Sequence, residues 1–206
     1  MKRHAWLLAL ALMALAPAAR GEGYIGLGGG KSDADISVEA EEVLFGIGGE
    51  CGLNVTCAFD ESDTGFKIFG GNRFNPYFAL ELSYIDFGEF SATAVGPSTS
   101  GGTLRFRLLA DVWAIGIAGL GLIPAGRFDV FVKAGAAYWS ADLTASAIDT
   151  VFGAVSETDT RDGGNLLWGA GLQWNGERVS LRAEFERVDV DEIDIDLVSA
   201  SAIFRF

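Results

Sequence analysis

Strict alternation of apolar and other residues between Asp63 and Phe90 is the feature that most constrains the fold of this chain. The segment DTGFKIFGGNRFNPYFALELSYIDFGEF contains two such runs, joined by a short polar turn at residues 72–76. One face of these strands would carry Phe66, Ile68, Gly70, Phe78, Leu80, Leu82 and Tyr84, and the other Lys67, Phe69, Ala79, Glu81, Ser83 and Ile85. Period-two alternation places one face of each strand against an apolar medium. A lone lysine and a lone glutamate on the other face suit a narrow, filled barrel interior.

The first residues resemble an export signal rather than part of the fold. Lys2, Arg3 and His4 precede an uncharged, mostly apolar run of 15 residues, Ala5–Ala19. Small residues at positions 16–18 or 19–21 offer a cleavage site. We therefore predict a signal peptide over residues 1–21, cleaved near 18–21, and a single domain over 22–206. A retained N-terminal helix is the alternative.

The charge and hydropathy of the chain exclude several classes of protein. Without Lys2, Arg3 and Arg20 the chain has 12 basic and 28 acidic side chains, a balance that argues against a nucleic-acid partner. Half of its residues are nevertheless apolar. The longest later uncharged stretch, Val112–Gly126, has 15 residues, whereas a membrane-spanning helix needs about 20. A closed barrel is the remaining way for an exported apolar chain to cross a membrane.

Alternation elsewhere predicts six more strands, for eight in total. The six are 23–30, 103–123, 128–140, 164–174, 178–189 and 193–206, and the long connections include 31–62, 90–102 and 141–163. Long and short connections take turns along the chain. This pattern predicts an all-β fold, an eight-stranded antiparallel up-and-down transmembrane barrel with short periplasmic turns and long extracellular loops. Aromatic residues near predicted strand ends fit two interfacial girdles: Tyr24, Tyr77, Tyr84, Trp139, Trp174, Phe204 and Phe206.

Two local features lead to sharper expectations. Arg105, Arg107 and Asp111 share a parity with Trp113 and Ile115, and they cannot all face one polar interior. We therefore expect a β-bulge between residues 108 and 111. In the last short turn, the Asn-Gly pair at 175–176 is expected to supply positive φ.

Cys51 and Cys57 are the only cysteines. Export to an oxidising compartment favours a local disulfide between them over two free thiols. A metal site built on this pair lacks the histidine or second cysteine pair that would complete it.

An eight-stranded barrel is just wide enough for side chains to fill its interior, so a wide pore is excluded. Charges inside must pair, because a lone buried charge is costly. Glu81 with Arg182 or Lys133 is therefore first a structural device, and a leaky ion path is the alternative.

Catalysis and metal binding receive little support. The only histidine, His4, leaves with the signal, and the usual serine mechanisms need a histidine base. We therefore predict that the protein is not an enzyme. We also predict no cofactor, because the glycines at 28–30 lack the other residues of a phosphate-binding loop. One acidic cluster is a weak candidate for Ca²⁺ and otherwise a solvated face: Asp189, Asp191, Asp194 and Asp196.

Three stretches resemble the small outer-membrane barrels of the outer-membrane protein A type: the 66–90 hairpin, GRFDVFVKAGAAYW at 126–139, and the last three strands ending in Phe206. The resemblance covers essentially the whole mature chain, and it leads us to expect a protein without the periplasmic peptidoglycan-binding domain of longer relatives. It implies a lumen charge network of Glu81, Lys133, Arg182 and Glu184, to which the alternation adds Lys67. Gln173 stands where a relative has an acidic residue. It also implies a C-terminal signal for the barrel-insertion machinery: Val198, Ala200, Ala202, Phe204 and Phe206.

By this resemblance we expect a structural protein of the outer membrane of a Gram-negative bacterium, in contact with lipid and lipopolysaccharide. It would contribute to envelope integrity and present acidic loops for adhesion or host contact. The alternatives are a narrow, low-conductance channel for ions or small solutes, and a soluble lipocalin-like barrel that binds an apolar ligand.

Overall fold

The computed structural model describes residues 21–34, 54–98, 101–190 and 193–206. The predicted signal peptide lies outside the described residues, apart from Gly21 at its end. No helix long and apolar enough to span a bilayer occurs in the described part of the chain.

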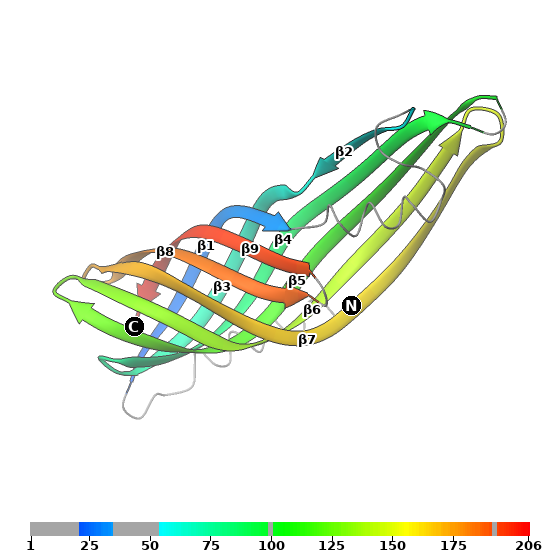
Figure 1. Ribbon diagram of the computed structural model, residues 1–206. Helices are drawn as coiled ribbons and strands as arrows, with labels where there is room; N and C mark the ends of the chain where they lie inside the picture. Colours follow the sequence, from blue (N-terminus) through cyan, green and yellow to red (C-terminus); the bar gives the residue numbers. More distant parts are fainter. Residues whose placement is uncertain (1–20, 35–53, 99–100, 191–192) are drawn as a thin grey trace.

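Nine strands make up the described structure (Figure 1). They are β1 (Glu22–Ala34), β2 (Thr56–Asp60), β3 (Ser62–Asn75), β4 (Phe78–Pro97), β5 (Thr103–Ala125), β6 (Phe128–Asp149), β7 (Gly153–Asn175), β8 (Val179–Val190) and β9 (Ile193–Arg205). Eight of them close into an antiparallel ring in the order β4-β3-β1-β9-β8-β7-β6-β5, with β5 pairing back to β4. The short β2 pairs with the outer part of β4. The predicted eight-stranded barrel is confirmed.

Two faces with opposite chemistry follow from the alternation in each barrel strand. Leu80, Leu166 and Leu181 point outward and are between 39% and 55% exposed. Their chain neighbours on the other face, such as Glu81 and Arg182, are buried in the lumen. The outward face is therefore the lipid face, and the inward face is the core.

Short turns join the strands at one rim of the barrel. β1 begins and β9 ends at the same rim, with Tyr24 opposite Arg205. Residues 76–77, 126–127 and 176–178 form these turns. Gly126 adopts a left-handed φ of 67°, which glycine tolerates without strain. Gly176 does not have positive φ, so the expectation for the Asn-Gly pair is wrong at that glycine.

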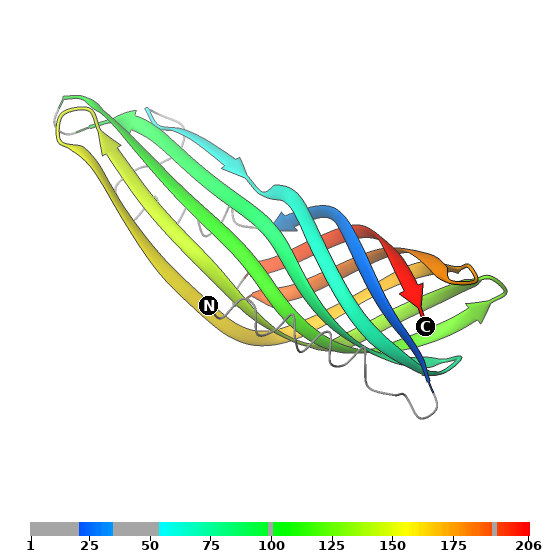
Figure 2. The ribbon, with the colours of Figure 1, turned by 180° about the vertical axis from the view of Figure 1, so that it is seen from behind.

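The opposite rim is uneven, because four neighbouring strands continue far beyond the others (Figures 1 and 2). We call this extension the blade; it consists of β2 and residues 88–97, 103–112, 141–149 and 153–161. Residues 90–102 and 141–163 were expected to be loops, and the described part of them is mostly paired strand. Sequence alternation is faint there because most of these side chains are small or polar on both faces, while cross-strand hydrogen bonds continue the ladder from the barrel.

The irregular register lies in a different strand from the predicted one. The β4–β5 register shifts between Asp86 and Gly88, and Gly88 has a φ of 84°. The β5–β6 register runs without a shift from Leu104 to Ala125. Arg105, Arg107 and Asp111 therefore share the outward face with Trp113, and the predicted bulge at 108–111 is wrong. These charged side chains can face outward without a bulge, because this part of β5 lies beyond the apolar belt of the barrel.

Candidate functional site

Six charged side chains meet in the middle of the lumen and are nearly inaccessible to water. Lys67 comes from β3, Glu81 from β4 and Lys133 from β6. The remaining three come from alternate positions of β8: Arg182, Glu184 and Glu186. We call this set the ion cluster. Three cations and three carboxylates give it no net charge, which is the arrangement that the cost of burying charge demands.

Each lysine of the ion cluster contacts all three carboxylates. Lys67 Nζ lies 2.6 Å from Glu184 Oε2 and 3.9 Å from Glu81 Oε1, and it also donates to Glu186. Lys133 Nζ lies 2.9 Å from Glu184 Oε1 and 3.6 Å from Glu81 Oε1, and it donates to Glu186 as well. The cluster is thus one connected network that ties β3, β4, β6 and β8 together across the lumen.

Arg182 forms the periplasmic side of this network. Its Nη1 donates to Glu81 Oε2 at 2.7 Å, while Nε and Nη2 donate to Gln173 Oε1. The guanidinium lies 4.8 Å from the ring centroids of both Phe69 and Phe131. Charge pairing and cation–π contacts therefore hold it in one position.

Apolar layers lie on both sides of the ion cluster. The layer toward the blade includes Ile85, Phe87, Trp139, Leu167 and Leu197. The layer toward the short turns comprises Tyr24, Phe69, Ala79, Leu120, Leu122, Phe131 and Ile203. An ion crossing the lumen would have to pass the layer toward the blade, where buried apolar side chains do not replace its hydration shell.

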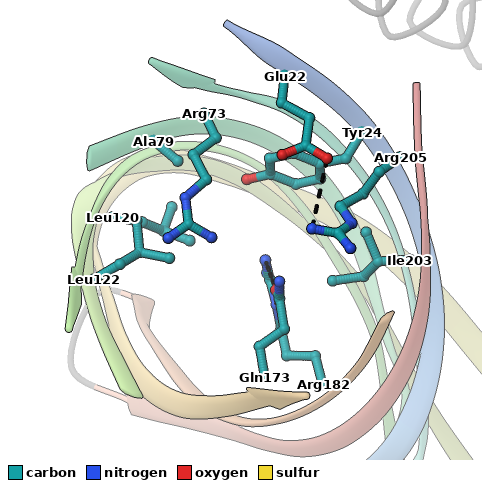
Figure 3. Close-up of a pocket in the computed structure, with 10 residues that line it drawn as sticks. All are labelled: Glu22, Tyr24, Arg73, Ala79, Leu120, Leu122, Gln173, Arg182, Ile203 and Arg205. Atoms are coloured by element: carbon teal, nitrogen blue, oxygen red, sulfur yellow. Dashed lines mark hydrogen bonds and ion pairs between the residues drawn. The ribbon is translucent and has the colours of Figure 1, made fainter. Parts of the chain in front are cut away.

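The periplasmic mouth holds a small cavity (Figure 3). Arg73, Arg182 and Gln173 extend into it, and Arg205 lies 3.5 Å from Glu22 at its edge. Arg73 is itself held by Asp129 at 2.6 Å. The volume of about 20 Å³ has room for little more than one or two water molecules. The cavity is therefore the closed end of the barrel and not the entrance to a pore.

The structure places all six residues of the predicted lumen network inside the barrel: Glu81, Lys133, Arg182, Glu184, Lys67 and Gln173. The prediction omitted Glu186, although it shares the inward parity of Glu184 and could have been found from it. It also omitted the Arg73–Asp129 pair, because Arg73 was assigned to a turn.

The other predicted sites have mixed outcomes. Cys57 lies in β2, but Cys51 is outside the described residues, so their disulfide stays a prediction. Asp191 is also outside, and Asp194 and Asp196 pair with Arg187 at 2.8 and 2.6 Å. No metal-binding group of acidic, histidine and cysteine side chains occurs within the described ranges. Val198, Ala200, Ala202, Phe204 and Phe206 are all exposed on the outward face; their role as an insertion signal stays a prediction.

The blade contrasts with the lumen because it is solvated. Residues 153–162 of β7 are all exposed, on both faces of the strand. Among the described strands, β8 begins to pair with β7 only at Leu167, so residues 153–166 form an open sheet edge. The opposite edge of the blade is covered by β2. The blade is therefore a hydrogen-bonded sheet whose two edge strands are β2 and β7.

These features define a small transmembrane β-barrel with a filled lumen and a protruding sheet. Residues 5–206 match the family described as the outer membrane protein beta-barrel domain, and the chain belongs to that family. No curated protein sequence matches it.

Solved structures support the same fold. The attachment invasion locus protein Ail of Yersinia pestis, in complex with the heparin analogue sucrose octasulfate, superposes with a TM-score of 0.51 at 18% identity. That match covers 91% of this chain and 99% of Ail. Neisserial surface protein A gives a TM-score of 0.52 at 13% identity, over 89% of this chain and 97% of that protein. The N-terminal barrel of OprF from Pseudomonas aeruginosa gives 0.50 at 12% identity, over 91% and 98%.

Proposed function

We propose that this protein is a surface attachment protein of the outer membrane of a Gram-negative bacterium, with a sealed barrel as its anchor and the blade as its contact surface. The observation that carries the proposal is the blade itself. A barrel that served only as a structural element of the membrane would not need four strands that each extend about ten residues beyond the apolar belt. Binding surfaces are commonly placed on such exposed segments, held by a rigid scaffold.

The open edge of β7 adds a specific mode of contact. Unpaired N–H and C=O groups along an exposed strand can accept an extended peptide as an additional strand. Ail is an attachment protein by name, which agrees with an adhesive role. At 18% identity, the similarity to Ail is evidence for the fold.

The side chains in the lumen favour a role as a membrane anchor over a role as a channel. The internal pairing of six charges, and the apolar layer between them and the blade, argue against a continuous polar path through the described barrel. We infer that the ion cluster is a structural device that contributes to envelope integrity. Planar-bilayer recording tests this inference, with background conductance expected for the refolded protein. Steady openings that disappear in Glu81→Ala would contradict it and favour the narrow channel.

The attachment role is tested by shortening the blade while keeping the barrel. Asp142 faces Thr160, and Phe90 faces Ala110, so an Asn-Gly turn can replace the residues between the members of each pair. Cells with this variant are expected to lose adhesion to host-cell or matrix-coated surfaces. Surface labelling and heat-dependent gel mobility should show that the barrel is still inserted. Undiminished adhesion by the shortened variant would overturn the proposal.

A further inference from the structure

The outward face of the blade is divided into two bands of opposite character. The cross-strand register places Glu89, Asp111 and Asp142 opposite one another, in a row just beyond the aromatic belt at Trp113. The two rows nearest the tip are different. They consist of Thr56, Val95, Arg105, Ile148 and Ala154 in one row, and Ala58, Thr93, Arg107, Ser146 and Ser156 in the other. We call these ten residues the distal face; it contains no acidic residue.

Arg105 and Arg107 dominate the charge of the distal face. Both side chains are exposed, and neither forms an ion pair with any residue in the described ranges. Most other cations of the described chain pair with a carboxylate, as Arg73, Lys133 and Arg187 do. In a chain with a formal charge of −13, no carboxylate of the described ranges accounts for the position of these two arginines.

The spacing of the two arginines suits a repeating anion. Residues two apart in a strand are on the same face and about 7 Å apart. The acidic row is four residues from Arg107, at Asp111, about 13 Å along the strand. Asp60 of β2 lies on the same face in the row between, about 12 Å from Arg107 across two strands and along two residues. Both separations exceed the screening length of about 8 Å at physiological ionic strength, so these carboxylates weaken binding at the distal face only slightly.

The remaining side chains of the distal face are four with hydroxyl groups, two alanines, and the apolar Val95 and Ile148 that flank Arg105. Thr56, Thr93, Ser146 and Ser156 surround the two arginines. Hydroxyls both donate and accept hydrogen bonds, as sugar hydroxyls do, and guanidinium groups bind phosphate and sulfate oxygens in pairs. Guanidinium and hydroxyl groups side by side, with apolar Val95 and Ile148 beside Arg105, match a glycan chain, whose rings have both polar edges and apolar faces.

We propose that the distal face, centred on Arg105 and Arg107, binds a glycan that carries sulfate or phosphate groups. This deepens the proposed attachment role and rests on it. Because attachment requires a partner on another surface, the source is a sulfated polysaccharide on a foreign surface. Binding to phosphorylated sugars of the glycolipid in the same outer leaflet is the outcome that would overturn this source.

Binding of fluorescent dextran sulfate to the mature protein in detergent tests the site, with unsulfated dextran as the neutral probe. Arg105→Gln/Arg107→Gln is expected to lower the affinity at least tenfold and to reduce the slope of log affinity against log salt by about two. Arg127→Gln/Arg178→Gln removes two exposed, unpaired arginines from the opposite rim and makes the same charge change, so it should cost less than twofold. Equal losses in the two double variants, or no loss in either, would overturn the proposal.

A second arm identifies the source. Nanodiscs with and without lipopolysaccharide are compared for hydrogen exchange of the blade amides, in the wild type and in Arg105→Gln/Arg107→Gln. Protection that depends on both lipopolysaccharide and the arginines assigns the site to the cell's own glycolipid. Dextran sulfate binding without such protection assigns it to a foreign glycan.

The two proposals can fail separately. If Arg105→Gln/Arg107→Gln abolishes polyanion binding but cells still adhere, attachment stands and uses another part of the blade. If the shortened blade leaves adhesion intact, attachment fails whatever the polyanion result.

Discussion

The lumen and the blade are built from the same strands, yet they treat charge in opposite ways. In the lumen, Lys67, Lys133 and Arg182 each contact at least two carboxylates, and none of the three is more than 4% exposed. On the blade, Arg105 and Arg107 are exposed and have no ion-pair partner in the described chain. The difference arises from the medium: a charge in a filled barrel must be neutralised, whereas a charge in water is already solvated. Ion pairing is therefore required of charged side chains in the lumen and not of those on the blade.

The two regions meet at a defined junction. Ser32 Oγ donates to the backbone oxygen of Asp63 at 3.0 Å and also to that of Phe87. The Asp63 carboxylate accepts from the backbone N–H groups of Thr64 and Glu89 at 2.7 and 2.8 Å. β1, β3 and the irregular part of β4 are thus tied together where β4 leaves the barrel. This junction fixes the direction in which the blade projects.

The largest effect is expected from breaking the ion cluster. Lys67→Met removes one of three cations and leaves Glu184 and Glu186 buried without a hydrogen-bond donor from β3. We expect a loss of about 3 to 5 kcal/mol in the free energy of unfolding, because a buried pair that loses one partner leaves an uncompensated charge. Urea unfolding in lipid vesicles, monitored by tryptophan fluorescence, measures this. A loss below about 1 kcal/mol would mean that water reaches the cluster.

A smaller loss is expected at the junction. Gly88→Ala places a side chain on a residue with a φ of 84° and brings its Cβ into contact with the Asp63 carboxylate. Strain of this kind costs about 1 to 3 kcal/mol. Limited proteolysis should show faster cleavage in the blade than in the barrel. Gly101→Ala also has positive φ but meets no neighbouring atom, so it separates the backbone strain from the contact.

Acid should reduce the stability of the junction by less than Gly88→Ala does. The backbone N–H groups of Glu89 and Thr64 hold the pKa of Asp63 below its ordinary value. A lowered folded-state pKa stabilises the protein above the unfolded pKa of about 3.9, and this stabilisation is lost as the pH falls through the folded value. The protection factors of the amides at residues 86–90, which correct for slower intrinsic exchange in acid, should therefore fall below about pH 4 in the wild type. Asp63→Asn should show fast exchange already at pH 7, and identical pH profiles would refute the role of the carboxylate.

The smallest effect on stability is expected on the distal face. Arg105→Gln/Arg107→Gln should change the free energy of unfolding by less than about 0.5 kcal/mol, because exposed, unpaired side chains contribute little to folding. The urea assay used for Lys67→Met provides the direct comparison. A large loss would show that these arginines belong to the structure, and would remove the contrast between lumen and blade.

The sequence alone was sufficient for the barrel, because lipid and lumen impose opposite chemistry on alternate residues. Leu80 beside Glu81 and Leu181 beside Arg182 indicate strand, phase and closure together. Even Glu186 follows from its parity with Glu184. The periodic pattern thus predicts what each barrel residue faces wherever the two faces meet different media.

The blade, the bulge and the partners within the ion cluster were decided only by the tertiary structure. Beyond the apolar belt most side chains on both faces meet water, so alternation no longer distinguishes a strand from a loop, and β4–β7 continue through pairing with one another. The phase of Arg105 could not be assigned, because a charge facing outward is excluded in lipid but not in water. Which carboxylate meets which cation depends on cross-lumen distances between strands that are far apart in the sequence.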